Sequence, residues 1–124
     1  MTTESGRRIL AVMDDLFFAS KIRAAAQHIG AEVEFVKTAE AARQSAARDI
    51  PSLVIVDLQS QNAHLSDLAR AMKDDARTSN IPLIGFFSHV QIDLKNRAAE
   101  VGFDRALPRS AFVARLTDIL QGNF

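Results

Sequence analysis

The hydrophobic positions form two kinds of pattern that alternate along the chain. Apolar residues run without interruption through Ile9–Met13 and Leu53–Val56, and almost without interruption through Ile81–Phe87. A strand that is buried on both faces is apolar at every position, whereas a strand with one exposed face alternates. These three runs therefore predict central strands of a parallel sheet with helices on both sides.

The segments between these runs carry apolar residues at helical spacing. Gly30 is placed to end the first helix, because glycine readily adopts the left-handed conformation. Thr38 predicts the cap of an alanine-rich helix over Ala39–Ala47, and Ser110 predicts the cap of a last helix that ends at Gly122. The apolar stripes of the first, third, fourth and last predicted helices are, in this order, Phe18, Ile22, Ala25 and Ile29; Leu65, Leu68, Ala69 and Met72; Val90, Leu94, Ala98 and Val101; and Phe112, Leu116, Ile119 and Leu120.

Two further strands have weaker patterns. Glu32–Phe35 alternates polar with apolar residues, which is typical of an edge strand, and Ala106–Leu107 marks a short final strand before Pro108. Five strands then alternate with five helices, and each parallel connection crosses over with the right-handed sense. The pattern predicts an α/β fold, a single doubly wound five-stranded parallel sheet flanked by five helices.

Composition narrows the possible functions. A length of 124 residues with 48% hydrophobic residues suits one domain with one sheet. The 15 basic and 15 acidic residues cancel, so no net field favours nucleic acid or an anionic membrane. The chain contains no cysteine, and no apolar stretch is long enough to span a bilayer or act as a secretory signal. We expect a soluble, cytoplasmic protein that binds neither nucleic acid nor membrane.

Polar and charged residues follow the predicted strands directly. Asp14 and Asp15 follow the first strand, Asp57 the third, Ser88 the fourth and Arg109 the fifth. In an open parallel sheet, the loops at the carboxyl ends of the strands form the usual ligand crevice. Carboxylates bind Mg²⁺, while a hydroxyl and a cation hold phosphoryl oxygens, so this set indicates phosphoryl transfer with a hard cation.

Four segments, in order, resemble the landmarks of one family. They are Ile9–Asp14, Pro51–Asp57, Ile81–Ser88 and Gly102–Arg109. Their sequences and spacing are similar to those of the CheY-like receiver domain of bacterial response regulators, over nearly the whole chain. The resemblance implies the flavodoxin-like strand order 2-1-3-4-5. It places the domain at residues 7–122, between a flexible N-terminus at 1–6 and a tail at 123–124.

The resemblance implies a role for each residue of the site. Asp57 would accept a phosphoryl group from a phosphohistidine on a histidine kinase or phosphotransfer protein. Asp14, Asp57 and the backbone carbonyl of Gln59 would hold Mg²⁺. Ser88 would donate a hydrogen bond to the phosphoryl group, and Arg109 stands where the family has a lysine. Such a domain belongs to two-component signal transduction and is not itself an enzyme.

Several site positions depart from the family pattern. Met13 occupies the first place of an acidic pair, which predicts weak Mg²⁺ binding, and Asp15 takes the vacant role only if the loop bulges. Arg109 replaces a compact ammonium by a planar guanidinium. His89 stands where the family has a very small residue and would crowd the donor. The loop after Asp57 lacks the expected proline and glycines, which are replaced by Gln61, Asn62 and Leu65.

The output side departs as well. Ala106 replaces the aromatic residue that follows the hydroxyl during activation, and Ser110 replaces a proline. In the family, the fourth helix, fifth strand and fifth helix contact a partner or a second receiver. Without the aromatic ring we expect association through this face, including parts of Gln91–Val101, to be constitutive; a homodimer is one form that it could take.

Each signal also has an ordinary structural interpretation. Asp57, Asp14, Asp15 and Ser88 could cap backbone amides, and Arg109 could be a solvated surface residue. Three interpretations stay open: a phosphoaccepting receiver, a degenerate pseudo-receiver that acts as a phosphorylation-independent interaction module, and a small flavodoxin-like enzyme or flavin binder. The chain has no tryptophan or tyrosine to stack on a flavin and no glycine-rich phosphate loop, which disfavours the third.

Overall fold

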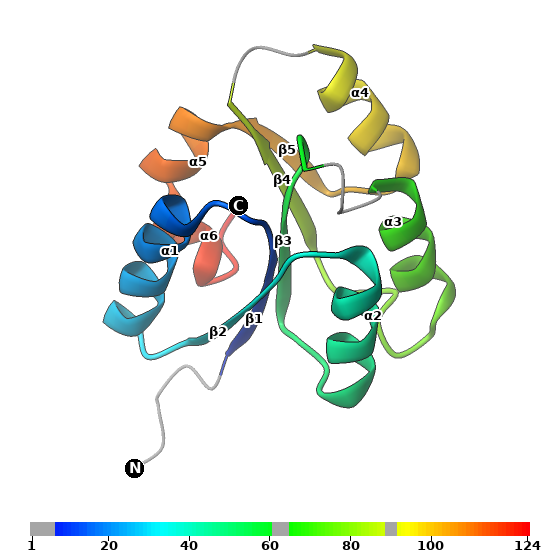
Figure 1. The fold of residues 1–124 in the computed structure, drawn as a ribbon, viewed down its shortest axis with the longest axis horizontal. Helices are drawn as coiled ribbons and strands as arrows, with labels where there is room; N and C mark the ends of the chain where they lie inside the picture. Colours follow the sequence, from blue (N-terminus) through cyan, green and yellow to red (C-terminus); the bar gives the residue numbers. More distant parts are fainter. Residues whose placement is uncertain (1–6, 61–64, 89–91) are drawn as a thin grey trace.

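The computed structural model describes residues 7–60, 65–88 and 92–124. Its strands form one parallel sheet in the order β2-β1-β3-β4-β5, which confirms the predicted fold class and strand order (Figure 1). The order in which strands are added reverses at β1, because β2 lies on one side of β1 and β3 on the other. A crevice is therefore expected at the carboxyl ends of β1 and β3. The strands are β1 (Arg8–Val12), β2 (Glu32–Val36), β3 (Leu53–Asp57), β4 (Leu83–Phe87) and β5 (Arg105–Pro108).

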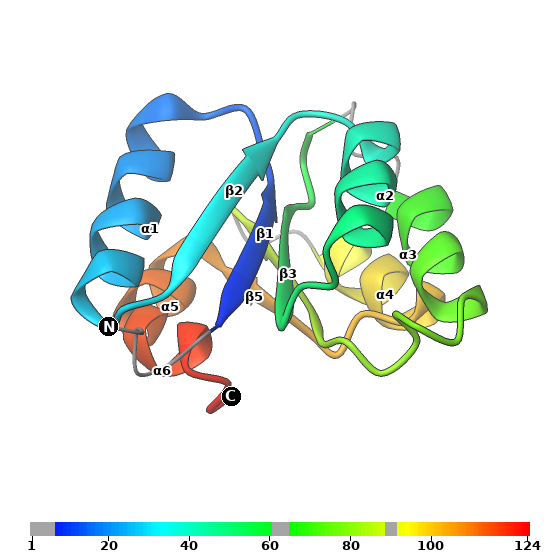
Figure 2. The ribbon, with the colours of Figure 1, turned by 90° about the horizontal axis from the view of Figure 1, so that it is seen from below.

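Helices cover both faces of the sheet. One layer contains α1, α5 and α6, and the other contains α2, α3 and α4 (Figures 1 and 2). None of the helices in the described part of the chain has the length and apolar character needed to cross a membrane. The helices are α1 (Leu16–His28), α2 (Ala39–Arg48), α3 (Leu65–Asp74), α4 (Ile92–Val101), α5 (Arg109–Ala114) and α6 (Leu116–Leu120).

The central strands bury both faces, as their continuous apolar runs predict. Along β3, Val54 and Val56 pack in the cluster beneath α2, α3 and α4, whereas Leu53 and Ile55 pack in the cluster beneath α1, α5 and α6. Successive side chains of a strand point to opposite faces, and the two clusters follow from this alternation. The same rule separates Phe87 from Phe86, so each helical layer receives one of these rings.

Two predicted helix boundaries are confirmed by their local geometry. Thr38 is the N-cap of α2, and its side chain accepts a hydrogen bond from the Ala41 amide at 3.1 Å. Gly30 follows the end of α1 with φ 75°, a conformation that costs glycine no steric penalty. The chain can therefore turn directly from α1 into β2, which lies at the sheet edge as expected.

The last predicted helix differs from the observed structure. Its N-cap position is Pro108 instead of Ser110, and helical geometry begins at Arg109. The helix ends at Ala114, and a second helix begins after Arg115, whose φ of −113° departs from helical values. Pro108 has a fixed φ and joins β5 to α5 without a loop. No cis peptide occurs among the described residues, so the Arg109–Ser110 bond is trans.

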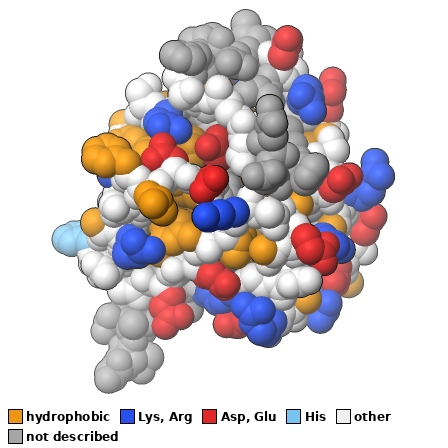
Figure 3. Space-filling view, viewed as in Figure 1, with side chains coloured by type: hydrophobic (Ala, Val, Ile, Leu, Met, Phe, Trp, Pro, Cys, Tyr) orange, Lys and Arg blue, Asp and Glu red, His pale blue; other side chains and the backbone are white. Residues whose placement is uncertain are grey.

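Charged side chains of both signs are interspersed over the surface in Figure 3, in agreement with the formal net charge of zero. Large apolar side chains are also exposed, at the start of α1. Leu16 is 80% exposed and Phe17 is 77% exposed. These two residues lie shortly after β1, at the carboxyl ends of the strands.

Candidate functional site

The predicted site residues lie at the carboxyl ends of the parallel strands. Asp57 is the last residue of β3, and its Cα is paired with that of Phe86 on β4. Ser88 follows β4, and Arg109 follows β5 as the first residue of α5. The sheet therefore brings Asp57, Ser88 and Arg109 to one rim from three separate segments.

Asp57 is half-buried at the end of β3. Burial raises the pKa of its carboxyl group, because the charged form loses solvation. The Gln59 amide, which donates to Asp57 Oδ1 at 3.0 Å, and the charge of Arg109 both oppose this rise in pKa, whereas the charge of Asp15 adds to it. The Asp57 carboxylate is thus influenced by one cation and by one competing anion.

Gln59 connects Asp57 to Ser88, because its backbone amide donates to Asp57 and its side chain binds Ser88. Gln59 Oε1 accepts hydrogen bonds from the Ser88 amide at 2.6 Å and from the Ser88 hydroxyl at 2.7 Å. The family resemblance implies a role only for the backbone carbonyl of Gln59. It does not predict this side-chain contact, because no local pattern indicates a bond across 29 positions. In this arrangement the Ser88 hydroxyl is engaged by the loop after Asp57.

Arg109 is held by an acid and by two aromatic rings. Its Nη1 lies 3.4 Å from Asp15 Oδ2, and its guanidinium carbon lies 4.6 Å from the Phe18 ring centroid and 5.6 Å from that of Phe86. A guanidinium over a ring face is attracted by the ring quadrupole. Its Nε is buried and has no hydrogen-bond partner among the described residues. These contacts place the planar cation near Asp57, whose Cα is paired with that of Phe86.

The two acids after β1 have different surroundings. Asp15 caps α1, because its Oδ1 accepts the Phe18 amide at 3.0 Å, and its other oxygen faces Arg109. The exposed Asp14 carboxylate instead lies 3.7 Å from Lys37 Nζ, at the end of β2. Asp15, rather than Asp14, is thus the acid that faces the cation beside Asp57.

Two features around β1 bear on the predicted Mg²⁺ site. Met13 is only 3% exposed and packs in the core beneath α1. No group of three histidine, cysteine, aspartate or glutamate residues in the described parts of the chain is placed to hold a metal ion. Mg²⁺ requires near-ideal octahedral oxygen ligation, and the Asp14 carboxylate is paired with Lys37. Binding by Asp14, Asp57 and the Gln59 carbonyl stays a prediction.

Leu58 anchors the loop after Asp57 in the core. A Cβ atom built on Gly85 of β4 would lie 2.5 Å from Leu58 Cδ2, so any larger residue at position 85 would force the Leu58 side chain to shift. Leu58 is 5% exposed and packs in the cluster beneath α2, α3 and α4. Gly85 interrupts the apolar run of β4, but its partner could not be identified before the register was known.

Several predicted departures cannot be placed. His89, Gln61 and Asn62, and with them the predicted shape of the loop after Asp57, lie outside the described residues.

Ala106 is half-buried on β5 and packs against the cluster beneath α2, α3 and α4. Its methyl group contributes to the core where the family has an aromatic ring.

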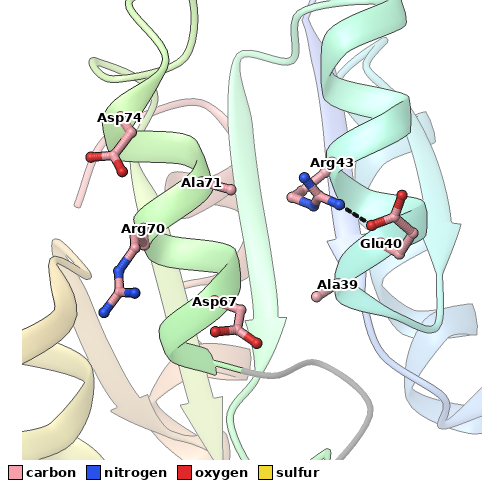
Figure 4. A pocket seen from close by; sticks show the side chains of 7 residues that line it. All are labelled: Ala39, Glu40, Arg43, Asp67, Arg70, Ala71 and Asp74. Carbon is pink, nitrogen blue, oxygen red and sulfur yellow. Dashed lines mark hydrogen bonds and ion pairs between the residues drawn. The ribbon is translucent and has the colours of Figure 1, made fainter.

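A groove of about 440 Å³ lies apart from this rim, between α2 and α3 (Figure 4). Ala39 and Ala71 line it from the two helices, and Arg43 is ion-paired with Glu40 on α2 itself. None of the predicted site residues lines this groove, so the rim around Asp57 is the candidate site.

Comparison with known proteins identifies the fold. No family model and no curated protein sequence matches the chain. A response regulator from Hahella chejuensis matches with a TM-score of 0.85 and 20% identity, over 93% of this chain and 92% of that one. The chemotaxis response regulator CheY4 of Vibrio cholerae matches with a TM-score of 0.82 and 18% identity, over 96% and 99%.

A third similar structure holds a metal ion. It is the receiver domain of a sensor histidine kinase from Pseudomonas aeruginosa, with a magnesium ion coordinated in its active-site cleft. It matches with a TM-score of 0.81 and 21% identity, over 94% of this chain and 96% of that one. These similarities confirm that the chain has the CheY-like fold of response-regulator receiver domains.

Proposed function

We propose that the protein is an atypical receiver domain in a phosphorelay, with Asp57 as the phosphoacceptor. The observation that carries this proposal is the placement of Asp57 at the end of β3, half-buried and within the field of Arg109. A carboxylate nucleophile near a cation at the carboxyl end of a strand suits phosphoryl transfer, which depends mainly on positioning and charge stabilisation. Similarity to receiver domains of the same fold supports the same interpretation.

The proposed reaction is transfer from a phosphohistidine. A carboxylate oxygen of Asp57 attacks phosphorus, the phosphorus–nitrogen bond breaks, and the leaving imidazole takes up a proton, so an acyl phosphate is formed. Arg109 stabilises the phosphoryl oxygens, because guanidinium groups bind such oxygens in a bidentate manner. Ser88 contributes its hydroxyl when the bond to Gln59 opens. The donor is a histidine kinase or a phosphotransfer protein.

The test is modification by a small phosphodonor, followed by intact mass. We expect one added phosphoryl group in the wild type and none in Asp57→Asn. Asp118→Asn, which removes an exposed acid from α6, is the matched control and should be modified like the wild type. Modification that persists in Asp57→Asn would contradict the assignment.

Mg²⁺ is the second variable of this assay. A bound divalent cation would neutralise charge on the phosphoryl oxygens. Because Met13 supplies no carboxylate and Asp14 is paired with Lys37, we propose weak binding and a modest dependence of the modification rate on Mg²⁺. Met13→Asp restores the missing acid and should increase this dependence. An equal dependence in both proteins would show that Met13 does not limit binding.

A second function is favoured by the residues around β1. Met13 is buried where the family has an acid, and Asp14 is paired with Lys37. These features suit a pseudo-receiver that binds partners without phosphotransfer. The proposed partner surface is the face of α4, β5 and α5, where constitutive association is expected because Ala106 has no ring to rotate. Absence of any modification of the wild type would favour this function.

A further inference from the structure

Asp15 joins two features of the site through its two carboxylate oxygens. Oδ1 accepts the Phe18 amide at 3.0 Å and so caps α1. Oδ2 lies 3.4 Å from Arg109 Nη1, across 94 positions of the sequence. A single side chain therefore connects the start of α1 to the cation beside Asp57.

Phe18 strengthens this connection. Its amide donates to Asp15, and its ring lies beneath the guanidinium of Arg109, with 4.6 Å between the guanidinium carbon and the ring centroid. Phe18 is 3% exposed, and its ring centroid lies 4.9 Å from that of Phe86. The ring beneath the guanidinium is therefore held in place by core packing. Movement of the guanidinium must therefore change the surroundings of the first turn of α1.

Asp15 and Asp57 compete for the charge of Arg109. Asp57 is near Arg109, because its Cα is paired with that of Phe86, whose ring centroid lies 5.6 Å from the guanidinium carbon. The charge of Arg109 accordingly lowers the pKa of Asp57, and the charge of Asp15 raises it. The Asp15 contact is long for a hydrogen bond, and Arg109 Nε has no partner in the described part of the chain. A phosphoryl group adds charge and acceptor oxygens at residue 57, which Arg109 can bind through two donors.

We propose that Asp15 is a positioning residue that restrains Arg109 from approaching residue 57 in the unmodified protein and transmits a change of charge at residue 57 to the start of α1. When residue 57 gains negative charge, Arg109 moves toward it and releases Asp15 Oδ2, so the cap of α1 is altered. The part that concerns a phosphoryl group rests on the proposed function. The exposed Leu16 and Phe17 follow Asp15 directly, so this end of α1 differs between the two states.

A double-mutant cycle tests the positioning role. Asp15→Asn retains a capping oxygen, because asparagine caps helices as well as aspartate, and removes only the charge. We expect it to accelerate phosphodonor modification about two- to fivefold, the effect of freeing a partly exposed ion pair. In an Arg109→Gln background the same change should have a clearly smaller effect, because only the direct repulsion between Asp15 and Asp57 is then removed. An equal acceleration in both backgrounds, or none in either, would overturn the proposal.

A second measurement does not depend on phosphorylation. The backbone amide resonance of Phe18 and the Nε resonance of Arg109 are compared between wild type and Asp57→Asn, with Asp74→Asn on α3 as the control. We expect both resonances to move in Asp57→Asn and neither to move in the control. The Phe18 resonance should not move when Arg109→Gln/Asp57→Asn is compared with Arg109→Gln. If neither resonance moves, the proposal is overturned. If both move but the wild type accepts no phosphoryl group, only the proposed function fails.

Discussion

At the scale of single residues, the chemistry of the site is set by the partial desolvation of Asp57. The carboxyl group lies at the end of a buried strand, where fewer water molecules stabilise its charge, and burial is the largest influence on its pKa. Gln59 and Arg109 recover part of that stabilisation. The charged form of Asp57 is therefore less stable in the native state than in the unfolded chain.

The first stability prediction follows from this shift. Because the native pKa of Asp57 is raised above its ordinary value of 3.8, the native state binds this proton more tightly than the unfolded chain does. The free energy of unfolding must then fall as the pH rises from the ordinary pKa through the raised one. Asp57→Asn removes this loss, so the variant should be more stable than the wild type at neutral pH.

Urea unfolding over a range of pH checks this prediction. The advantage of Asp57→Asn should shrink as the pH approaches 3.8, where Asp57 is increasingly protonated in the wild type too. Asp118→Asn is the control for the loss of one exposed negative charge. A pH-independent difference between Asp57→Asn and the wild type would show that titration of Asp57 is not its cause.

At the scale of elements, polar side chains fix the ends of helices and the edge of the sheet. Asp15 and Thr38 cap α1 and α2. Arg8 of β1 donates to Glu34 of β2 and to the buried Ser45 of α2, each at 2.7 Å. These bonds join the edge strand β2 to β1 and join α2 to the same arginine of β1.

The cap of α2 can be tested by itself. Thr38→Ala removes the oxygen that accepts the Ala41 amide and should lower the free energy of unfolding by about 1 kcal/mol. Thr38→Ser keeps the hydroxyl and should retain most of the stability. The measurement is urea unfolding of the three proteins at one pH. Equal losses in both variants would mean that the threonine methyl group, not the cap, is responsible.

At the scale of the whole molecule, an aromatic cluster joins the site to the core. Phe18 of α1, Phe86 of β4 and Phe112 of α5 have neighbouring centroids 4.9 Å and 5.0 Å apart, and Arg109 lies over two of the rings. Phe86 and Phe112 are fully buried. The support of the cation beside Asp57 is therefore part of the hydrophobic core between the sheet and one helical layer.

Phe112→Ala should test how much this cluster contributes. Removing a fully buried ring leaves a cavity, and the expected loss is about 3–5 kcal/mol of unfolding free energy. The neighbouring Val113 is 39% exposed, and Val113→Ala should cost about 0.5 kcal/mol or less. Thermal and urea unfolding of both variants measure the difference. A comparable loss at the two positions would contradict the central role of the ring.

The amino-acid sequence by itself determined the elements whose causes are local. The apolar run Leu53–Val56 predicts a doubly buried strand, and Thr38 predicts the start of α2, because burial periodicity and helix capping act within a few residues. The sequence could also place Asp57, Ser88 and Arg109 on one rim, since strand ends in a parallel sheet share an edge. Resemblance to a known family supplied the strand order.

Only the tertiary structure decided the contacts within the rim. It showed that Asp15, rather than Asp14, faces Arg109, and that Gln59 binds Ser88. It also divided the last helix at Arg115. Such contacts join segments 29 and 94 positions apart, and they depend on sheet register and on the rotamers that packing allows. No periodic pattern along the chain encodes them, because both partners take their positions only when the sheet has formed.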